Sequence, residues 1–491
     1  MNLKIPKKPI QCFNFVNNEL VKPNGETYKV ISPYNNSIIG EYNASLKEEV
    51  NLAVHEAHHA QKEWANTPIK ERSKVLFNFR NILIRDIDEI SHIIAAESGK
   101  THAEAKAGLL KGIEVLEYAI SIQNLDLGGK MEVSRGVFCE YRREPLGVVA
   151  NITPFNFPAM VPMWTIPICL ALGNAYIWKP SDKTPLTSNL IANALKESGL
   201  PNGLFQVLQG KTETVNAIID HPLVSAIGFV GSTKVAKIIY DRASLLGKRV
   251  LALGGAKNHI ILLPDANLDL SGIGISDSFT GCAGQRCMAA SVLLAVGDVD
   301  KHINKILDRA KSLKLGTDMG AIITETQKEF LNNAIERAVN NGATILLDGR
   351  KAKDPEQYDG GNWLGPTILD NVKPNAEAAC DELFGPIISI IRCKNIQEAI
   401  EIENANPYGN ACSVFTSSGS LAEKVIQNAK SGMIGINVGV PVPREPFSFG
   451  GINASKFGHG DITGVHSLNF WTNIKKVTTK WEKQNDQTWM S

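Results

Sequence analysis

Residues 224–244 read VSAIGFVGSTKVAKIIYDRAS, and they contain an apolar run, a turn of small residues and an amphipathic run in direct succession. The apolar run up to Val230 predicts a buried strand, and the spacing of apolar residues after Thr233 predicts a helix. Gly231 and Ser232 form the turn between them. A strand, a tight turn and a helix together make the repeating unit of a parallel α/β sheet.

The same alternation extends on both sides of this unit. Strands are expected at 146–154, 174–181, 203–210, 224–232 and 248–255, with helices between them at 160–173, 185–201, 213–222 and 233–244. Five strands that alternate with helices predict a parallel, doubly wound sheet. Beyond Gly255 a second α/β alternation begins, with helices expected at 270–290, 300–314, 325–341, 396–405 and 419–430.

The two ends of the chain have other patterns. Helical periodicity predicts helices at 46–65, 70–98 and 102–123. Residues 130–150 alternate apolar and polar side chains, which is typical of an extended hairpin. Residues 467–484 alternate like an exposed strand. Exposed edge strands usually find a partner strand, so the C-terminus is expected to join subunits.

The composition excludes several functional classes. The chain has 491 residues, of which 43% are hydrophobic and 21% charged, and its net charge is +1. These values are typical of a soluble globular protein and favour neither nucleic acid nor a membrane as a partner. The eight cysteines are scattered, which indicates neither a disulfide framework nor a zinc site and favours the cytoplasm. The N-terminus lacks the apolar segment of a signal peptide.

One uncharged stretch, from Leu146 to Trp178, is long enough to span a bilayer. It contains four prolines, which would break a membrane helix repeatedly. We therefore expect a buried strand, a turn and a core helix there.

The turn at Gly231 and Ser232 is a candidate phosphate site, because small residues at a helix start leave backbone N–H groups free. Ser232 or Thr233 could instead be a simple N-cap, which on this motif alone is the favoured interpretation. No G-x-G-x-x-G motif follows a strand. Lys179 and Asp182 follow another strand end, where open α/β sheets bind ligands, so they could hold a ribose or lie in a solvated loop.

Cys287, in the segment GCAGQRCMAAS at 281–291, is a candidate nucleophile. Most free cysteines are buried and inert, but the adjacent Arg286 favours the thiolate. Cys282 has no charged neighbour and is expected to be a packing residue. Asn156 is a polar group in an apolar run, either a turn residue or a donor to an oxyanion.

Together these segments resemble the aldehyde dehydrogenase superfamily. The similar segments are TPFNFP (153–158), KPSDKTP (179–185), GFVGSTKVAK (228–237), LALGGAKN (251–258), GQRCMAAS (284–291), DELFGPI (381–387) and PFSFGGINASKFG (446–458). The resemblance implies an α/β fold with a Rossmann-type NAD-binding domain at 1–121 and 141–254. It also implies an α/β catalytic domain at 255–463 and a β-flap oligomerisation arm at 122–140 and 464–491, which would form a homotetramer as a dimer of dimers.

The resemblance also implies roles for single residues. Cys287 would be the nucleophile, and Asn156 would donate to the oxyanion. NAD would be held by Thr153, Phe155, Lys179, Asp182, Lys183, Gly231, Ser232, Gly254, Glu382 and Phe384. The Asp182 carboxylate would repel the 2′-phosphate of NADP, although Lys183 beside it weakens that preference.

Ala252 stands where hydrolytic members of the family carry the glutamate that activates water. Alanine cannot accept a proton, and general-base catalysis is typically worth ~10²–10⁴ in rate. A thiol with a pKa near 8.5 needs that base less, which points to coenzyme A as the acyl acceptor. In this respect the chain resembles the CoA-acylating methylmalonate-semialdehyde dehydrogenase branch, which implies propionyl-CoA or acetyl-CoA and CO₂ as products.

In that branch the substrate carboxylate would meet Arg286, and Lys111 would stand in place of a second arginine. Two alternatives remain open. One is hydrolytic, NAD(P)-dependent oxidation of another aldehyde to its acid. The other is a cysteine hydrolase that pairs Cys287 with His259, His459 or His466. No metal is expected, because His55, His58 and His59 on one helix are better explained as a solvated face.

Overall fold

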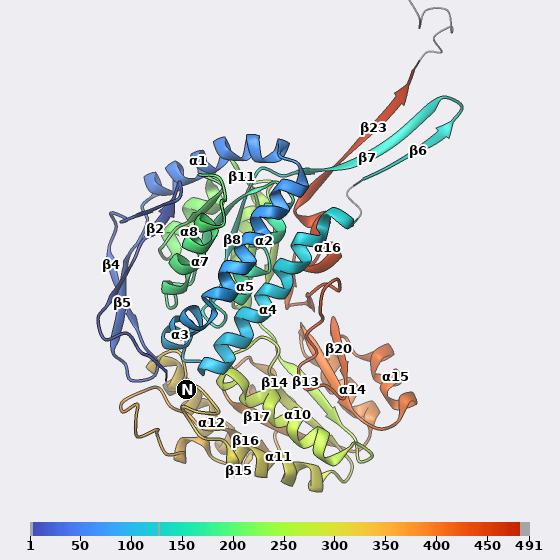
Figure 1. Cartoon of the computed structure of the whole chain (residues 1–491). Coiled ribbons are helices and arrows are strands. Elements are labelled where there is room, and N and C mark those ends of the chain that lie inside the picture. Colours follow the sequence, from blue (N-terminus) through green and yellow to red (C-terminus); the bar gives the residue numbers. More distant parts are fainter. Residues whose placement is uncertain (1–2, 126–127, 482–491) are drawn as a thin grey trace, which may run out of the picture.

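The computed structural model describes residues 3–125 and 128–481 (Figure 1). The residues quoted first lie in an eight-stranded sheet whose order is β22-β12-β11-β8-β9-β10-β2-β3. Its five central strands are β8 (Val148–Ile152), β9 (Ala175–Lys179), β10 (Phe205–Val207), β11 (Val224–Val230) and β12 (Arg249–Leu253). They pair in parallel throughout, so the predicted doubly wound sheet is confirmed.

Helices pack on this sheet and close its core. They are α1 (Lys47–Asn66), α5 (Met160–Met163), α6 (Ile166–Ala171), α7 (Leu186–Glu197), α8 (Thr212–Asp220) and α9 (Thr233–Leu245). The helix expected at 160–173 is in fact two short helices. Pro167 has no N–H to donate to the preceding turn, so one helix cannot run through it.

The helical pattern before residue 125 forms α2 (Ile69–Arg85), α3 (Ile87–Ser98) and α4 (His102–Ser121). The single helix expected at 70–98 was wrong. Asp86 leaves the helical region, with φ −98° and ψ 11°, and divides that segment into α2 and α3. Its carboxylate pairs with the neighbouring Arg85 guanidinium.

A second, seven-stranded sheet has the order β15-β16-β17-β14-β13-β19-β20. The strands are β13 (Asn258–Leu262), β14 (Ala290–Val296), β15 (Thr344–Leu347), β16 (Thr367–Asp370), β17 (Ile387–Cys393), β19 (Ala411–Phe415) and β20 (Met433–Ile436). Only β15, at one edge, pairs antiparallel among the described strands of this sheet. The helices of this part are α10 (Leu268–Thr280), α11 (Asp300–Ser312), α12 (Glu325–Asn340), α13 (Glu377–Cys380), α14 (Ile396–Ala405) and α15 (Gly419–Asn428).

The helix expected at 270–290 was wrong over nearly half of its length, from residue 281 onward. α10 ends at Thr280, and Cys282, Ala283 and Gly284 then adopt positive φ values of 56°, 52° and 69°. A right-handed helix cannot continue through left-handed residues. Cys287 consequently lies in an irregular turn between α10 and β14.

A three-stranded arm projects from the body of the molecule (Figure 1). It contains β6 (Gly128–Ser134), β7 (Val137–Pro145) and β23 (Thr472–Lys480), in the order β23-β7-β6. The expected hairpin is confirmed. The expected C-terminal strand begins later than predicted, because Gly464–Phe470 forms α16. Residues 482–484 of that prediction lie outside the described part of the chain.

Short strands complete the fold. They are β1 (Ile10–Cys12), β2 (Asn14–Val16), β3 (Glu19–Val21), β4 (Thr27–Ile31), β5 (Ile38–Asn43), β18 (Tyr408–Gly409), β21 (Ile452–Asn453) and β22 (Lys456–Phe457). β22 pairs with β12, so residues from the expected catalytic domain complete the first sheet. Within residues 3–125 and 128–481, no helix is long and apolar enough to cross a membrane.

Candidate active site

Cys287 lies where two cavities meet. The first cavity, of about 360 Å³, is lined by residues of both sheets, including Phe155, Asn156, Lys183, Gly231, Ser232, Gly254, Gly255, Glu382 and Phe384. The second cavity, of about 450 Å³, is lined mainly by α4, by the segment before β14 and by residues 438–449. Cys287 lines both of them. A group on its sulfur is therefore accessible from two directions.

The backbone of Cys287 is held from the strands beside it. The side-chain amides of Asn258 and Asn410 both donate to its carbonyl oxygen, at 2.7 and 2.9 Å. The Oδ1 atom of Asn258 accepts from the N–H of Ala411 at 3.1 Å, which ties this amide to the start of β19. Two buried amides, one at the start of β13 and one just before β19, thus fix the peptide plane that follows Cys287.

The turn before Cys287 is also anchored at two points. The Glu104 carboxylate accepts from the N–H of Cys282 at 2.6 Å and from the N–H of Thr101 at 2.9 Å. Gln285 accepts from the N–H of Ile323 at 2.9 Å and donates to the carbonyl of Ala321 at 3.0 Å. Sequence reasoning missed these anchors. Thr101 and Glu104 have the spacing of a capping box, but that pattern does not show that Glu104 has a second partner.

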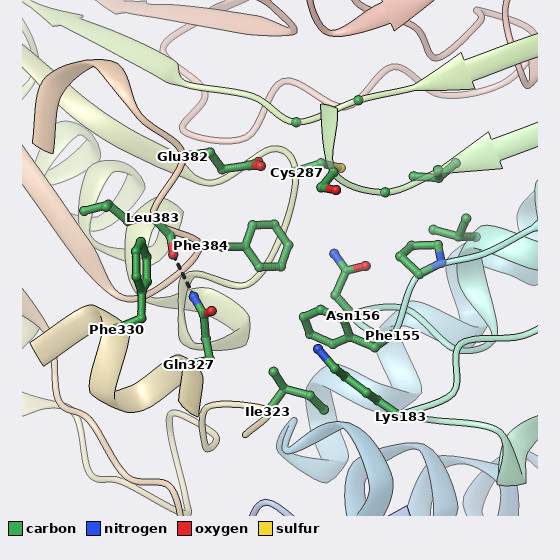
Figure 2. Close-up of a pocket in the computed structure, with 17 residues that line it drawn as sticks. Phe155, Asn156, Lys183, Cys287, Ile323, Gln327, Phe330, Glu382, Leu383 and Phe384 are labelled. Carbon is green, nitrogen blue, oxygen red and sulfur yellow. Dashed lines mark hydrogen bonds between the residues drawn. The ribbon is translucent and has the colours of Figure 1, made fainter. Parts of the chain in front are cut away.

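Asn156 is buried and points toward Cys287 across the first cavity (Figure 2). One of its amide hydrogens is donated to the carbonyl of Gln285 at 3.1 Å. An amide nitrogen carries two hydrogens, so one remains for a ligand oxygen. The structure therefore brings the two expected catalytic residues, Asn156 and Cys287, to the same place.

Burial, and to a smaller extent the nearby Glu382 carboxylate, raise the pKa of Cys287 to about 12, although Arg286 and Lys100 oppose this shift. The sequence interpretation that Arg286 would favour the thiolate was therefore incomplete. Burial outweighs the adjacent positive charge, and the free thiol is protonated at neutral pH.

Glu382 forms part of the wall of the first cavity, with its carboxyl end turned toward Cys287 (Figure 2). Its Oε1 atom accepts from the N–H of Ala256 at 2.9 Å. Burial raises the pKa of Glu382 to about 7, although the Ala256 N–H and Lys257 favour its charged form. A Cβ atom on Gly255 would lie 2.3 Å from Oε2, so glycine is needed there to leave room for the carboxylate.

Aromatic rings also line this cavity. The rings of Phe155 and Phe384 meet edge to face at 5.9 Å, and the ammonium group of Lys183 lies 4.9 Å from the Phe155 ring. Phe384 has a φ of 59°, a left-handed conformation that L-residues seldom adopt. Gln327 donates to the carbonyl of the preceding Leu383 at 2.9 Å, which fixes this turn (Figure 2).

The start of α9 lines the other side of the same cavity. Ser232 is its N-cap residue, but the Ser232 side chain does not cap the helix. Thr233 uses its hydroxyl to accept from the N–H of Gly255 at 2.8 Å. The first N–H groups of a helix have no partner within the helix, and they carry its positive dipole end. This end of the cavity is therefore suited to an anion.

Three of the expected cofactor residues are not part of the wall of either cavity. Thr153 is buried and accepts from the indole N–H of Trp178 at 2.8 Å. Lys179 is the last residue of β9, and burial lowers its pKa to about 8, although Asp182 opposes this shift. Asp182 lies in the loop that follows. A ligand would have to extend beyond the first cavity to reach them.

Cations predominate in the second cavity, which is lined by Arg286, Lys111 and Arg444 but by only one acid, Glu104, among the described residues. The Arg286 Nη2 atom donates to the carbonyl of Ser278 at 2.9 Å, and its buried Nε atom has no partner. The Lys111 ammonium is already paired with Glu114 and Glu445, at 2.9 and 3.1 Å.

Ala252 is fully buried in β12 and lines neither cavity. Among the described residues of the cavity walls there is no histidine. His259 is buried in β13, where burial lowers its pKa to about 3, and His459 and His466 line a separate depression beside β22. A cysteine–histidine hydrolase site is therefore not formed. In the part of the chain that the structure describes, no cluster of His, Cys, Asp and Glu has the arrangement of a metal site.

Comparison with known proteins gives the family. The aldehyde dehydrogenase family model matches residues 20–477. The chain is 38% identical to the rat mitochondrial methylmalonate-semialdehyde/malonate-semialdehyde dehydrogenase [acylating], over 96% of this chain and 89% of that protein. It is 37% identical to malonate-semialdehyde dehydrogenase 2 of Geobacillus kaustophilus, over 95% of this chain and 98% of that protein.

Solved structures agree with these relatives. The crystal structure of a putative methylmalonate-semialdehyde dehydrogenase from Sinorhizobium meliloti in complex with NAD has a TM-score of 0.95 and 34% identity, and the match covers 97% of this chain and 99% of that one. The crystal structure of the methylmalonate-semialdehyde dehydrogenase from Oceanimonas doudoroffii has a TM-score of 0.95 and 37% identity, and the match covers 96% of this chain and 99% of that one. The chain is therefore a member of the aldehyde dehydrogenase family, and an oxidoreductase.

Proposed function

We propose that this protein oxidises methylmalonate semialdehyde and malonate semialdehyde with NAD⁺ and transfers the acyl group to coenzyme A. The products would be propionyl-CoA or acetyl-CoA, with CO₂ lost from the malonyl-type acyl group. The observation that carries this proposal is Ala252 in the sequence, which stands where the resemblance places the glutamate that would activate water. The names of the similar proteins support the same substrates.

The first cavity is suited to the pyrophosphate and nicotinamide ends of NAD. The free N–H groups at the start of α9, next to Gly231 and Ser232, match a pyrophosphate, and the Glu382 carboxylate matches ribose hydroxyls. Phe384, Phe155 and Gly254 would bound the nicotinamide side. NAD⁺ supplies the hydride acceptor. Lys179, Asp182, Lys183 and Thr153 would bind or support the adenosine end, and the Asp182 carboxylate favours NAD over NADP.

The nucleophilic step uses Cys287 and Asn156. The thiol of Cys287 releases its proton to water as its sulfur attacks the aldehyde carbon, and the second amide hydrogen of Asn156 stabilises the oxygen that becomes negative. The clamp from Asn258 and Asn410 keeps the Cys287 backbone fixed during this attack. Loss of hydride from the aldehyde carbon leaves a thioester on Cys287.

The substrate carboxylate is expected to lie in the second cavity. Arg286 lines this cavity with its Nη2 atom bound to backbone carbonyls, and its positive charge would pair with a carboxylate. Lys111 contributes a positive charge at the wall of this cavity, although its ion pairs with Glu114 and Glu445 leave it less available. Among the described residues that line the first cavity, Lys183 is the only cation.

The central experiment measures NADH formation from each semialdehyde with and without CoA. Sustained turnover is expected only with CoA, and mass spectrometry should identify propionyl-CoA or acetyl-CoA. Cys287→Ser serves as the control and should be inactive. Equal steady turnover without CoA, with release of the free acid, would instead support hydrolytic aldehyde oxidation.

We also propose that the chain forms a homotetramer, a dimer of dimers, through its three-stranded arm. β23 is an edge strand, and nine of its positions pair with β7 on one side only.

The cysteine content of the chain favours the cytoplasm as the location of the protein. The expected domain boundaries, 1–121 with 141–254, 255–463, and 122–140 with 464–491, are part of the same proposal.

A further inference from the structure

We propose that Glu382 is the general base for the acyl-transfer step, in which it takes the proton of the incoming CoA thiol and passes it to the sulfur of Cys287. This inference rests on the proposed CoA acylation and gives that reaction a proton acceptor. It adds a catalytic task to a residue that would otherwise only hold a ribose.

The position of Glu382 carries the inference. Among the described residues that line the first cavity it is the only acid, and Cys287 lines the same cavity. Figure 2 shows its carboxyl end turned toward Cys287. Oε1 is fixed by the N–H of Ala256, whereas Oε2 has no hydrogen-bond partner in the described part of the chain. One oxygen is thus anchored, and the other remains available to a proton.

The groups around Glu382 keep it able to act as a base. Lys257 faces it and favours the carboxylate, while its ammonium donates to the carbonyl of Asp381 at 2.7 Å. Cys287 and Tyr408 are the other titratable groups that interact with Glu382, and its charge raises the pKa of each. Burial raises the pKa of Glu382 itself to about 7, so charged and neutral forms are both populated near neutral pH.

The step balances without an oxidant or a metal. The Glu382 carboxylate takes the proton from CoA–SH, and the thiolate attacks the carbonyl carbon of the Cys287 thioester. The new carbon–sulfur bond forms while Asn156 holds the oxyanion. The bond from carbon to the Cys287 sulfur then breaks, and that sulfur takes the proton from Glu382. The products are acyl-CoA, the free Cys287 thiol and the Glu382 carboxylate.

The high pKa of Cys287 makes this return of the proton important. A thiolate whose conjugate acid has a pKa of about 12 is a poor leaving group unless it is protonated as it departs. Glu382, with a pKa of about 7, can donate that proton. The same carboxylate is poorly matched to water, whose pKa of about 15.7 lies roughly seven units above that of a thiol.

The test is an exchange reaction that contains no NAD. Propionyl-CoA is mixed with isotopically labelled CoA, and mass spectrometry follows the label into propionyl-CoA through the Cys287 thioester. In the wild type the rate should rise with pH and level off above about 7, where Glu382 is charged. In Glu382→Gln the rate at pH 7 should fall about tenfold or more and should follow the thiol pKa near 8.5 instead.

Asp381→Asn is the matched control, because it removes the neighbouring exposed carboxylate and should leave the exchange rate and its pH profile unchanged. A series of thiols of falling pKa gives a second readout. The exchange rate of Glu382→Gln should fall less, relative to the wild type, with the more acidic thiols, because these thiols need no base. Circular dichroism checks that the Glu382→Gln variant is folded. If the variant does not fold, the pH profile of the wild-type exchange rate still tests the inference.

The outcomes separate the two proposals. If the wild type, like Cys287→Ser, catalyses no exchange, CoA is not the acyl acceptor and the proposed function fails. If the wild type exchanges and Glu382→Gln has the same rate and pH profile, the proposed function stands and Glu382 is not the base.

Discussion

At the scale of single residues, the reactivity of Cys287 is set by three side chains that differ widely in sequence position. Arg286 is adjacent, but its guanidinium is partly bound to backbone carbonyls at the end of α10. Glu382 lies 95 residues further along the chain and faces the thiol across the first cavity. Burial together with this carboxylate outweighs Arg286 and Lys100.

A test of this balance is alkylation of Cys287 in the protein without ligands. The thiolate is the reactive form, so wild-type alkylation at pH 8 should be slow and should rise with pH without levelling off below pH 10. Glu382→Gln removes a negative charge and should lower the pKa of Cys287, which speeds alkylation several-fold. Site-resolved mass spectrometry measures the rates, with the fully buried Cys169 as the internal control. An unchanged or slower rate in Glu382→Gln would contradict this account.

At the scale of elements, the turn that contains Cys287, residues 281–289, is an irregular segment held by helices and strands. β13 provides Asn258, the start of β19 is preceded by Asn410, and α4 provides Glu104. The turn contains two left-handed non-glycine residues, Cys282 and Ala283, each of which costs roughly 1–2 kcal/mol. These anchors compensate for that strain and keep Cys287 between the two cavities.

Removal of the anchors should therefore reduce catalysis and leave the fold intact. Asn258→Ala and Asn410→Ala each remove a buried hydrogen bond to the Cys287 carbonyl oxygen worth about 1–3 kcal/mol, so kcat should fall roughly 5- to 150-fold. Their effects should not add in the double variant, because both amides bind one carbonyl oxygen. Stopped-flow NADH formation measures the loss, and Asn404→Ala, on an exposed surface of α14, is the control. Strictly additive effects would show that the two amides act independently.

At the scale of the whole molecule, the two α/β sheets and the arm have distinct tasks. The first sheet presents the start of α9 to the first cavity, and the second sheet presents Cys287 and Glu382. The arm lies away from both cavities (Figure 1). Its outer strand β23 carries many exposed side chains and pairs with β7 alone among the described strands.

Truncation after Thr472 should therefore change assembly more than chemistry. The shortened chain keeps α16 and the buried Trp471 but lacks β23. We expect light scattering to give a smaller oligomer than that of the full chain, because a free β7 edge cannot replace the missing strand. Lys476→Ala, an exposed substitution within β23, is the matched control. A truncated chain with the full-length mass would place the interface elsewhere.

The sequence by itself determined the parallel sheets, because apolar strands and amphipathic helices alternate along the chain. That periodicity is local, and tertiary contacts do not change it. It also predicted Cys287 and Asn156 as catalytic residues and the missing acid at Ala252, since each belongs to a short motif. Tertiary structure alone decided that the helix expected at 270–290 stops at Thr280 and that Glu104 and Asn410 hold the turn that contains Cys287. It also decided that Glu382 faces Cys287 and that burial, rather than Arg286, sets the thiol pKa. Such effects depend on distance and solvent exclusion between residues far apart in the chain, and no local pattern encodes them.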